Sequence, residues 1–565
     1  MFEFNILSND ADEKLKFIRE ENGIYEYKFS CKSNGQRITL VTRIKCINCF
    51  TVWNHTVNFD RQLRAEWSSS KCISNVLSGL PYHALIGQNG NNVLAIAVSD
   101  VKNQVEIKSG IREENAAVTC KIVFNTPVKE NENYETIIRL DTRCIPYYEC
   151  IYSASEWWST LGYSCAHVPE SAKRPMYSSW YSFHQLLSHD EIIKECELAK
   201  KLGMDTIILD DGWQTEDTQR GYAYCGDWKS AYSKVGDMNK LVNSVHGMGM
   251  KIMLWYNIAF MGEYAKNSAE FKGMYMGDKL NGRYTLDPRY YKVRKYLTDL
   301  FSNAVMNWKL DGLKIDFVDS FVRSEDDVVT DKMDFPILED AVEELIKSIS
   351  DSLYKLNPEI MIEFRQNYIG PLMRKYANIF RVADCPDDSL RNRLGVVNLR
   401  LTSGECAVHS DMLMWNYDEP VEIAAKQIIN VLFSVPQISV RIEKLSNEHY
   451  KMLEFYLSLW IKYKELFADT KISAECPEAN YSKLCAQSDK KQAVVCYCDN
   501  TVNLDENKEK VIIVNGTAKD EFFIYTKRPV KYNVYNCMGE NVLSGKFNEG
   551  VLLLSIPVSG IAEFY

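Results

Sequence analysis

The spacing of apolar residues divides the chain into three regions. Up to about residue 160, short runs that alternate apolar and polar residues lie between turn-forming residues. They occupy residues 38–44, 92–99, 105–111 and 116–124. This alternation is typical of strands with one buried face, and its regular recurrence predicts an antiparallel β-sandwich. The same pattern predicts a small antiparallel β domain from runs at 493–498, 510–516, 521–526 and 550–558.

The middle of the chain has a different period. Short apolar runs rich in Ile, Val and Phe alternate with amphipathic stretches of helical length, which predicts βα units and a parallel sheet. The eight runs cover residues 176–183, 205–211, 251–257, 311–317, 359–364, 379–385, 406–415 and 437–442. A clear helical pattern follows every run except the sixth, after which the pattern of 388–401 is ambiguous. Eight strand–helix repeats match a (β/α)8, or TIM, barrel.

A doubly wound sheet is the competing arrangement. It would usually have fewer repeats and a glycine-rich phosphate loop after its first strand, and the sequence contains neither GxGxxG nor GxxxxGK[ST]. We therefore predict a multidomain fold of α/β and all-β parts, with a central barrel between two β domains. The predicted boundaries are 1–165 for the N-terminal sandwich, 166–475 for the catalytic barrel and 476–565 for the C-terminal β domain.

Composition restricts the partners and the compartment. The 565 residues include 66 Lys and Arg against 76 Asp and Glu, a formal charge of −10. Nucleic acid and anionic membranes favour basic surfaces, so we predict neither as a partner. No run approaches the roughly 18 apolar residues of a membrane helix, and residues 1–14 lack the basic start and apolar core of a secretory signal. An odd number of cysteines, 17, is typical of reduced thiols and predicts a cytoplasmic location.

Polar and aromatic residues follow the second and third predicted barrel strands. In a barrel of this kind, functional residues lie at the carboxyl ends of the strands. Asp210 and Asp211 end the second run, and two adjacent acids are costly to bury unless a ligand such as a polyol offers hydroxyl donors. A solvated loop or a helix cap is the alternative. Trp255 near the end of the third run offers ring surface to a ligand, unless it is a core residue.

The fourth run gives the most informative pattern. Side chains alternate between the two faces of a strand, so Lys314 and Asp316 are expected to share the inward face, while Phe317 faces the helices. An ammonium group near a carboxylate favours the ionised form and lowers the carboxylate pKa. That effect suits a carboxylate nucleophile, which must stay unprotonated at neutral pH. A structural salt bridge inside the barrel is the alternative interpretation.

The later strands add further charged and polar groups. They are Glu363, Arg365 and Asn367 on the fifth strand, Arg381 and Asp384 on the sixth, and His409 and Asp411 on the seventh. The eight histidines of the chain show no HxH or HExxH spacing, so we predict no metal and no other cofactor. Two aspartates on separate strands of one barrel fit glycoside hydrolysis, in which one attacks and the other protonates the leaving oxygen.

Five blocks together resemble the signature blocks of the retaining α-galactosidases of glycoside hydrolase families 36 and 27. They are SSWY (178–181), DDGW (210–213), LKIDF (313–317), the stretch from RVAD to the arginine at 391 (381–391) and DML (411–413). They lie in the family's order across the whole central barrel. The flanking β domains match the family 36 layout, although they are not specific to it.

The resemblance implies a role for each matching acid and for the lysine. Asp316 matches the nucleophile, and Lys314 matches the substrate-binding lysine beside it. Asp384 matches the general acid/base. Asp210 and Asp211 match the pair of acids that binds the 4- and 6-hydroxyls, which favours galactose.

The resemblance also covers two aromatic residues and breaks down at two places. Trp180 and Trp255 match aromatic positions that line the sugar site. Two residues separate Arg381 from Asp384 where the family usually has three, so Asp387 stays open as an alternative acid/base.

The second departure is the sequence EFRQN (363–367), which replaces the family's cysteine- and glycine-rich block. That block contacts the 2-position and the leaving-group side of the sugar. Arg365 and Asn367 could donate hydrogen bonds there, and we include them with Arg381 among the candidate substrate-binding residues.

The implied activity is that of a retaining α-galactosidase. It would hydrolyse terminal α-linked galactose from short oligosaccharides by double displacement through a galactosyl-aspartate intermediate. This mechanism requires an ionised Asp316, held so by Lys314, and a protonated Asp384 kept so by burial or a nearby charge. The alternatives are a galactosyl transferase of raffinose-synthase type, an α-N-acetylgalactosaminidase and a non-catalytic carbohydrate-binding protein. Because relatives are often oligomeric, a homo-oligomer is also considered.

Overall fold

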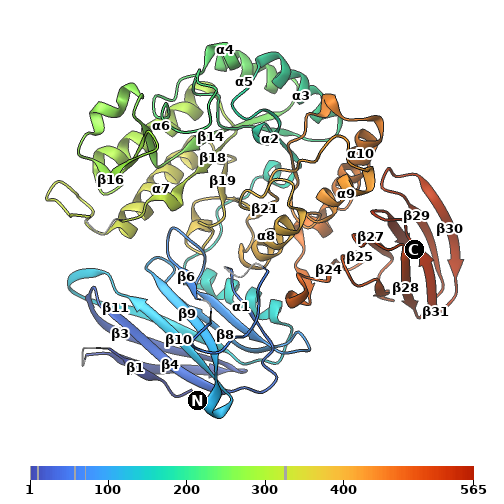
Figure 1. Cartoon of the computed structure of the whole chain (residues 1–565), viewed down its shortest axis with the longest axis horizontal. Coiled ribbons are helices and arrows are strands. Elements are labelled where there is room, and N and C mark those ends of the chain that lie inside the picture. The colour runs from blue at the N-terminus through green and yellow to red at the C-terminus, as the bar shows by residue number, and fades with distance from the viewer. Residues whose placement is uncertain (1, 9–11, 56–58, 70, 324–326) are drawn as a thin grey trace.

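The computed structural model describes residues 2–8, 12–55, 59–69, 71–323 and 327–565. A β-sandwich, an eight-stranded parallel barrel and a pair of C-terminal sheets follow one another along the chain. Figure 1 shows that the sandwich (blue) and the C-terminal sheets (red) lie on different sides of the barrel. The predicted fold class is confirmed.

The N-terminal region is the predicted sandwich. One sheet has the strands β1 (Asn5–Leu7), β4 (Arg37–Lys45), β10 (Ala117–Asn125), β9 (Val105–Arg112) and β6 (Cys72–Ser74), in that order. The other has β2 (Lys14–Glu21), β3 (Ile24–Asn34), β11 (Val128–Asp141), β8 (Asn92–Val98), β7 (Tyr82–Ile86) and β5 (Thr51–Trp53). Apolar side chains of both sheets form one core, in which Phe29 stacks on Phe124 with 5.3 Å between ring centroids.

The central sheet is the predicted barrel. Its strands are β12 (Met176–Ser178), β13 (Thr206–Leu209), β14 (Lys251–Asn257), β18 (Gly312–Asp316), β19 (Met361–Arg365), β20 (Ile379–Arg381), β21 (Ala407–His409) and β22 (Gln437–Ile438). Each strand pairs in parallel with the next, and β12 also pairs with β22. Isolated parallel bridges, His409 to Val435 and Leu413 to Ile438, bring the two end strands together. The barrel is therefore nearly closed.

Helices cover the outside of the barrel. They are α3 (His189–Lys201), α5 (Met238–Gly247), α6 (Tyr291–Trp308), α7 (Leu338–Leu356), α8 (Ser389–Thr402), α9 (Val421–Ile429) and α10 (Asn447–Lys462), with the short α4 (Tyr232–Val235) before α5. A small sheet of β15 (Phe260–Gly262), β17 (Arg283–Leu286) and β16 (Tyr275–Leu280) is inserted between β14 and α6.

Two local predictions in the barrel are wrong, and one stretch that was ambiguous is a helix. The first run, predicted as a strand over 176–183, ends at Ser178 and continues as the short helix α2 (Trp180–Phe183). The helix predicted after the fifth strand is only a 3-10 turn, Met373–Lys375, because the connection from β19 to β20 is short and contains the turn-forming pair Gly370-Pro371. Conversely, the ambiguous stretch is the full helix α8, which lacks a polar face because most of its residues are buried.

The C-terminal region consists of two sheets. The larger contains β23 (Ile472–Glu475), β24 (Lys483–Gln487), β25 (Lys491–Cys496), β27 (Lys510–Asn515), β32 (Ile561–Phe564), β29 (Val530–Tyr535) and β30 (Asn541–Phe547). The smaller contains β26 (Thr501–Asn503), β28 (Glu521–Thr526) and β31 (Gly550–Ser555). Most pairs are antiparallel as predicted, but β25–β27 and β26–β28 are parallel.

The helix α1 (Tyr147–Thr160) joins the three regions. The indole of Trp158 donates to the carbonyl of Val98 in the sandwich, over 2.9 Å. The Tyr147 hydroxyl donates to the carbonyl of Ala474 in the C-terminal sheet, also over 2.9 Å. Side chains of α1 belong to the same large apolar core as the barrel. The helix therefore ties both β domains to the barrel.

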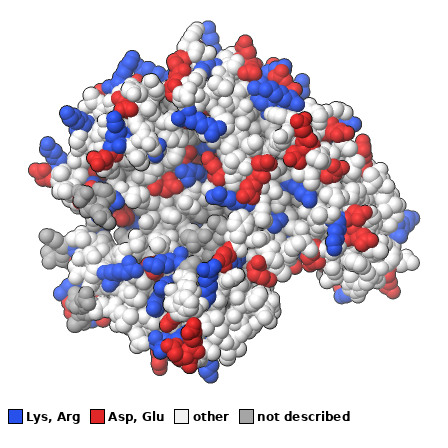
Figure 2. Space-filling view, in the orientation of Figure 1, with Lys and Arg blue, Asp and Glu red and all other residues white. Residues whose placement is uncertain are grey.

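Helix length and surface charge bear on whether a chain can enter a membrane. Within the described ranges, no helix is both long and apolar enough to cross a bilayer. On the face drawn in Figure 2, acidic and basic side chains are interspersed over all three regions.

Candidate active site

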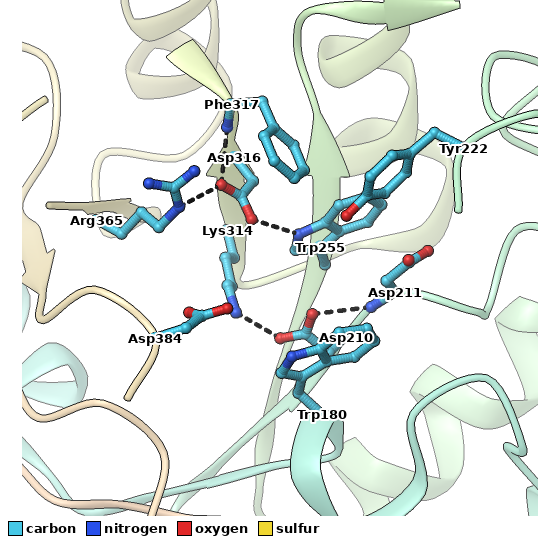
Figure 3. A pocket seen from close by; sticks show the side chains of 10 residues that line it. All are labelled: Trp180, Asp210, Asp211, Tyr222, Trp255, Lys314, Asp316, Phe317, Arg365 and Asp384. Carbon is cyan, nitrogen blue, oxygen red and sulfur yellow. Dashed lines mark hydrogen bonds and ion pairs between the residues drawn. The ribbon is translucent and has the colours of Figure 1, made fainter. Parts of the chain in front are cut away.

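A cavity of about 260 Å³ opens at the carboxyl ends of the barrel strands. It is lined by Trp180, Asp210, Asp211, Tyr222, Trp255, Lys314, Asp316, Phe317, Arg365 and Asp384 (Figure 3). Eight of the ten predicted site residues are in this set, and Arg381 and Asn367 are not. Because each water occupies about 30 Å³ of liquid, the cavity has room for a ligand the size of one sugar ring.

Asp316 is the last residue of β18, and both of its carboxylate oxygens accept hydrogen bonds. Oδ1 accepts from Nε of Arg365 over 2.6 Å and from the backbone N–H of Phe317 over 2.8 Å. Oδ2 accepts from the indole of Trp255 over 3.1 Å. Burial alone would raise the pKa of Asp316, but the charges of Arg365 and, next, Lys314 hold it below its ordinary value. Asp316 is therefore ionised at neutral pH.

Lys314 lies two residues earlier on the same inward face, as alternation predicts, but its direct partner is a different acid. Nζ donates to Oδ2 of Asp210 over 2.6 Å, and both side chains are buried. The main cation at Asp316 is thus Arg365 of the neighbouring strand, with Lys314 second. Burial raises the pKa of Asp210, and Lys314 opposes this rise.

Asp211 is held by two amide groups. Gln214 Nε2 donates to its Oδ1 over 2.7 Å, and Gln185 Nε2 donates to its Oδ2 over 2.8 Å. Burial, followed by the negative charge of Asp210, raises the pKa of Asp211 to about 6 despite these donors. Asp210 and Asp211 together present carboxylate acceptors at one end of the cavity.

Asp384 lies in the loop after β20, across the cavity from Asp316. Its Oδ1 accepts from the guanidinium of Arg381 over 2.9 Å, and its side chain is 53% exposed. Arg381 itself is buried and also pairs with Glu363 and Asp411, so it holds Asp384 from behind the cavity wall. Limited solvation by itself would raise the pKa of Asp384. The positive charges of Arg381 and then Lys314 have the larger effect and bring this pKa below its ordinary value. In the unliganded site the surroundings therefore favour ionised Asp384, the reverse of what a proton donor requires.

Two other candidates lie away from the cavity. Asp387 is exposed, and its carboxylate accepts from Nε2 of Gln427 on α9 over 2.8 Å. Asn367 is also exposed, and its carbonyl accepts from the backbone N–H of Gly79 in the sandwich over 2.7 Å. A Cβ on Gly370 would lie 2.5 Å from the carbonyl oxygen of Gly79, so the two loops are in close contact. Asn367 thus joins the barrel to the N-terminal domain.

Phe317 and Tyr222 line the cavity but were not predicted. Phe317 has a φ of 67°, so the chain leaves the strand alternation that was expected to turn its ring outward. Tyr222 lies in the long loop after β13, and its ring stacks on Trp255 with 6.2 Å between centroids. A loop residue without periodic neighbours gives no signal in the sequence. Both rings pack with Trp255 in one aromatic cluster, and Trp180 lies apart from it (Figure 3).

The cavity contains no evident metal site. In the part of the chain that the structure describes, no group of three or more His, Cys, Asp or Glu side chains could hold a metal ion. The available chemistry is that of carboxylates positioned by cations and indole or amide donors.

Comparisons with known proteins place this geometry in context. No family model matches the chain. It is 24% identical over 196 residues to the bifunctional α-galactosidase/sucrose kinase AgaSK of Mediterraneibacter gnavus, covering 33% of this chain and 19% of that protein. It is 22% identical over 261 residues to the α-galactosidase Mel36A of Lactobacillus acidophilus, covering 43% of this chain and 33% of that protein. The matched segments thus span a third or less of these relatives' own length.

The similarity of fold extends over nearly the whole chain. The galactosidase domain of AgaSK aligns with a TM-score of 0.65 at 13% identity, covering 100% of this chain and 85% of that one. A GH36 α-galactosidase, AgaA from Geobacillus stearothermophilus in complex with raffinose, aligns with a TM-score of 0.66 at 11% identity, covering 97% and 80%. The chain therefore has the fold of the glycoside hydrolase family 36 α-galactosidases and is a distant sequence relative of two curated α-galactosidases.

Proposed function

We propose that the protein is a retaining α-galactosidase that hydrolyses terminal α-linked galactose from short oligosaccharides. The observation that carries the proposal is that Asp316 and Asp384, from separate strands, line one cavity of monosaccharide size. An ionised carboxylate and a second carboxyl group at one sugar site are what a double displacement requires. The similarity to α-galactosidases supports galactose as the sugar.

In the first step, Asp384 donates its proton to the glycosidic oxygen while that oxygen leaves the anomeric carbon. An oxygen of Asp316 forms the new bond, giving a β-linked galactosyl-enzyme. Oδ2 of Asp316 is the better candidate for the attacking atom, because among the described residues Trp255 alone donates to it, while Oδ1 accepts from Arg365, Phe317 and Tyr368. A donor on the attacking oxygen reduces its nucleophilicity, so the less occupied oxygen reacts more readily.

In the second step, Asp384 removes a proton from water, which attacks the anomeric carbon and releases α-galactose. The charges around Asp384 favour this base role, since Arg381 and Lys314 lower its pKa. The ionised Asp316 opposes them, because two negative charges in one cavity repel each other. Once Asp316 is esterified that repulsion is lost and the pKa of Asp384 falls further. Asp384 thus changes from acid to base between the two steps. For the first step it must take up a proton as substrate binds.

The rest of the cavity would bind the sugar. Asp210 and Asp211 offer acceptors for the 4- and 6-hydroxyls, with Lys314 between Asp210 and the reacting centre. Trp180 and Trp255 offer ring faces. Raffinose and stachyose, which are bound by structural neighbours, are the first oligosaccharides to test.

Arg365 favours galactose over N-acetylgalactosamine. The family resemblance assigns the segment 363–367 to the 2-position of the sugar, where an acetamide needs small residues. Here Arg365, the last residue of β19, places a long side chain in the cavity lining, and it pairs with Asp316 and with Asp319, the latter 3.0 Å away. An α-N-acetylgalactosaminide should therefore be a poor substrate.

Rescue by azide separates the two carboxyl roles. In Asp316→Ala, azide should replace the nucleophile and convert a nitrophenyl α-galactoside to the β-galactosyl azide. In Asp384→Ala, azide should instead attack the galactosyl-enzyme and give the α-galactosyl azide. Asp387→Ala is the matched control and should keep wild-type turnover. Full activity of Asp316→Ala, or rescue with the opposite stereochemistry, would show that the assignment is wrong.

Two finer points belong to the same proposal. Product analysis with and without excess sucrose distinguishes hydrolysis from galactosyl transfer. The odd number of cysteines, 17, supports a reducing compartment such as the cytoplasm.

A further inference from the structure

A second and larger cavity lies at the opposite end of the barrel. Its volume is about 780 Å³. It lies between α1, the linker that leads to β12, the residues that begin β21, and the segment 468–471 before β23. These are the amino ends of the strands, far from the carboxyl ends that carry the proposed sugar site. None of the groups proposed for glycoside hydrolysis lines it.

Two cysteines line this cavity and interact with each other. Cys165 is in the linker between α1 and β12 and is partly exposed, and Cys406 is the residue before β21. The Cys165 sulfur accepts from the backbone N–H of Glu405 over 3.2 Å. The Cys406 thiol lies near enough to lower the pKa of Cys165, while its own weak hydrogen bonds go to the carbonyls of Arg374 and Ala377. The carbonyl of Ser403, 3.4 Å from the Cys165 sulfur, favours the thiol, whereas the N–H of Glu405 favours the thiolate.

A buried cation without an acidic partner lies beside this sulfur. Arg374 is fully buried, and its guanidinium donates to the carbonyls of Tyr163 and Ser155 and to the hydroxyls of Ser155 and Ser159. Among the described residues, no carboxylate forms an ion pair with Arg374. An unpaired buried charge is costly, and the Cys165 thiolate would supply the missing negative charge.

Gly404 brings the cation and the sulfur together. Its φ is 63°, and a Cβ at this position would lie 2.9 Å from Nη1 of Arg374 and 3.0 Å from the sulfur of Cys165. Because glycine has no Cβ, the Arg374 guanidinium and the Cys165 sulfur can both pack against the backbone at this position. A side chain here would force them apart.

Acidic and basic groups also line the cavity. They are Glu156, His167, Lys173, Arg400, Glu405, Asp469 and Lys471. Two of the acids are already paired, Glu156 with Lys471 over 2.7 Å and Asp469 with Lys173 over 2.9 Å.

We propose that Cys165 is a reactive thiolate, oxidised by small hydroperoxides that enter this cavity, and that Cys406 is its resolving thiol. The Cys165 thiolate attacks one peroxide oxygen, an S–O bond forms, the O–O bond breaks, and the leaving oxyanion takes a proton. The sulfur becomes a sulfenic acid and the peroxide is reduced by two electrons. The Cys406 sulfur then attacks the Cys165 sulfur, and water leaves with the sulfenic oxygen and the Cys406 proton. The product is a Cys165–Cys406 disulfide, the usual fate of a sulfenic acid beside a second thiol.

Peptide mapping of the intact protein after brief alkylation with iodoacetamide tests the thiolate. Cys406, Arg374 and the neighbouring N–H groups lower the pKa of Cys165 to about 6, although burial opposes them. Most of it is then thiolate at pH 6.5, and after allowing for the lower nucleophilicity of a less basic sulfur the gain over an ordinary thiol is about tenfold. Cys165 should be labelled about tenfold faster than the exposed Cys144 at pH 6.5, and this advantage should disappear near pH 9.5.

Hydrogen peroxide tests the second step. Wild-type protein should form the Cys165–Cys406 disulfide, while Cys406→Ser should stop at a sulfenic acid that dimedone traps on Cys165. Cys144→Ser is the control and should leave both results unchanged. Equal labelling of Cys165 and Cys144 at pH 6.5, or peroxide-treated wild type with Cys165 still a thiol, would overturn the proposal. Neither readout uses glycosidase activity, so the result is independent of the proposed function.

Discussion

Replacing Arg365 by Gln tests which cation keeps Asp316 ionised. The guanidinium and the carboxylate are 2.6 Å apart, and their side chains are only 16% and 13% exposed. Two charges about 4 Å apart at an effective dielectric constant of about 20 interact by about 4 kcal/mol, or roughly 3 pKa units. Carboxylates beside an arginine usually shift by about 1–3 units. Arg365→Gln should therefore raise the pKa of Asp316 by about 1–3 units.

The pH dependence of kcat/KM for a nitrophenyl α-galactoside measures this shift. The reaction requires ionised Asp316, so kcat/KM falls as the pH drops through the pKa of Asp316 in the free enzyme. In the wild type this acidic limb lies below the ordinary range for aspartate, because that pKa is lowered. In Arg365→Gln the limb should move up by about 1–3 pH units, and in Arg365→Lys by less, since a cation remains.

The control is Arg323→Gln. Arg323 is an exposed arginine in the loop after β18, 3.5 Å from Glu339, and its loss should leave the limb in place. If Arg365→Gln turns over too slowly, the pH dependence of covalent labelling of Asp316 by an activated fluorosugar reports the same ionisation. An acidic limb in Arg365→Gln that coincides with that of the wild type would refute the reasoning and would make Lys314 the dominant cation.

Three further outcomes are expected. Arg381 favours ionised Asp384, and hydrolysis of an α-galactosyl disaccharide needs a proton donor, whereas a nitrophenyl galactoside has a good leaving group. The ratio of kcat/KM for the disaccharide to kcat/KM for the nitrophenyl galactoside should therefore fall between about pH 5 and 8. A constant ratio would contradict this. Trp255→Phe removes the indole that orients Oδ2 of Asp316 and part of the ring surface lining the cavity, and these losses should outweigh the gain in nucleophilicity, so kcat/KM should fall by about 10- to 100-fold with little change in Tm. The pKa of Asp211 is raised to about 6, so ionised Asp211 destabilises the fold increasingly as the pH rises from about 3.9 through 6. Asp211→Asn should therefore raise Tm more at pH 8 than at pH 5 in calorimetry, while weakening catalysis. A Tm of the variant below that of the wild type at pH 8 would show that the Asp211 charge does not destabilise the fold.

The sequence predicted the barrel and most of the residues that line the cavity, because both depend on short-range periodicity. Alternation along β18 correctly places Lys314 and Asp316 on one face. It does not specify which groups from other strands they contact. Arg365 reaches Asp316 because β18 and β19 are neighbours, whereas Lys314 reaches past β14 to Asp210 at the end of β13. Such pairings depend on strand order and on side-chain length, and neither is encoded in one strand's pattern.

The remaining features that the sequence did not predict have local causes. The left-handed backbone of Phe317 breaks the alternation at the residue after the strand ends. Tyr222 comes from a loop, where position depends on tertiary contacts alone. The helix α8 gave an ambiguous pattern because it packs against both the barrel and α1, and a helix buried on several sides loses the polar stripe that makes helices recognisable.

The contact between Gly79 and the Asn367–Gly370 loop limits how this protein can be re-engineered. The loop follows directly on Arg365, and its backbone is hydrogen-bonded to the sandwich with no room for a side chain at Gly370. A chimera that joins this barrel to a foreign N-terminal module would lose the support of that loop, even if every residue lining the candidate site were retained. The segment around Gly79 and the Asn367–Gly370 loop should therefore be transferred together, or varied together in a library.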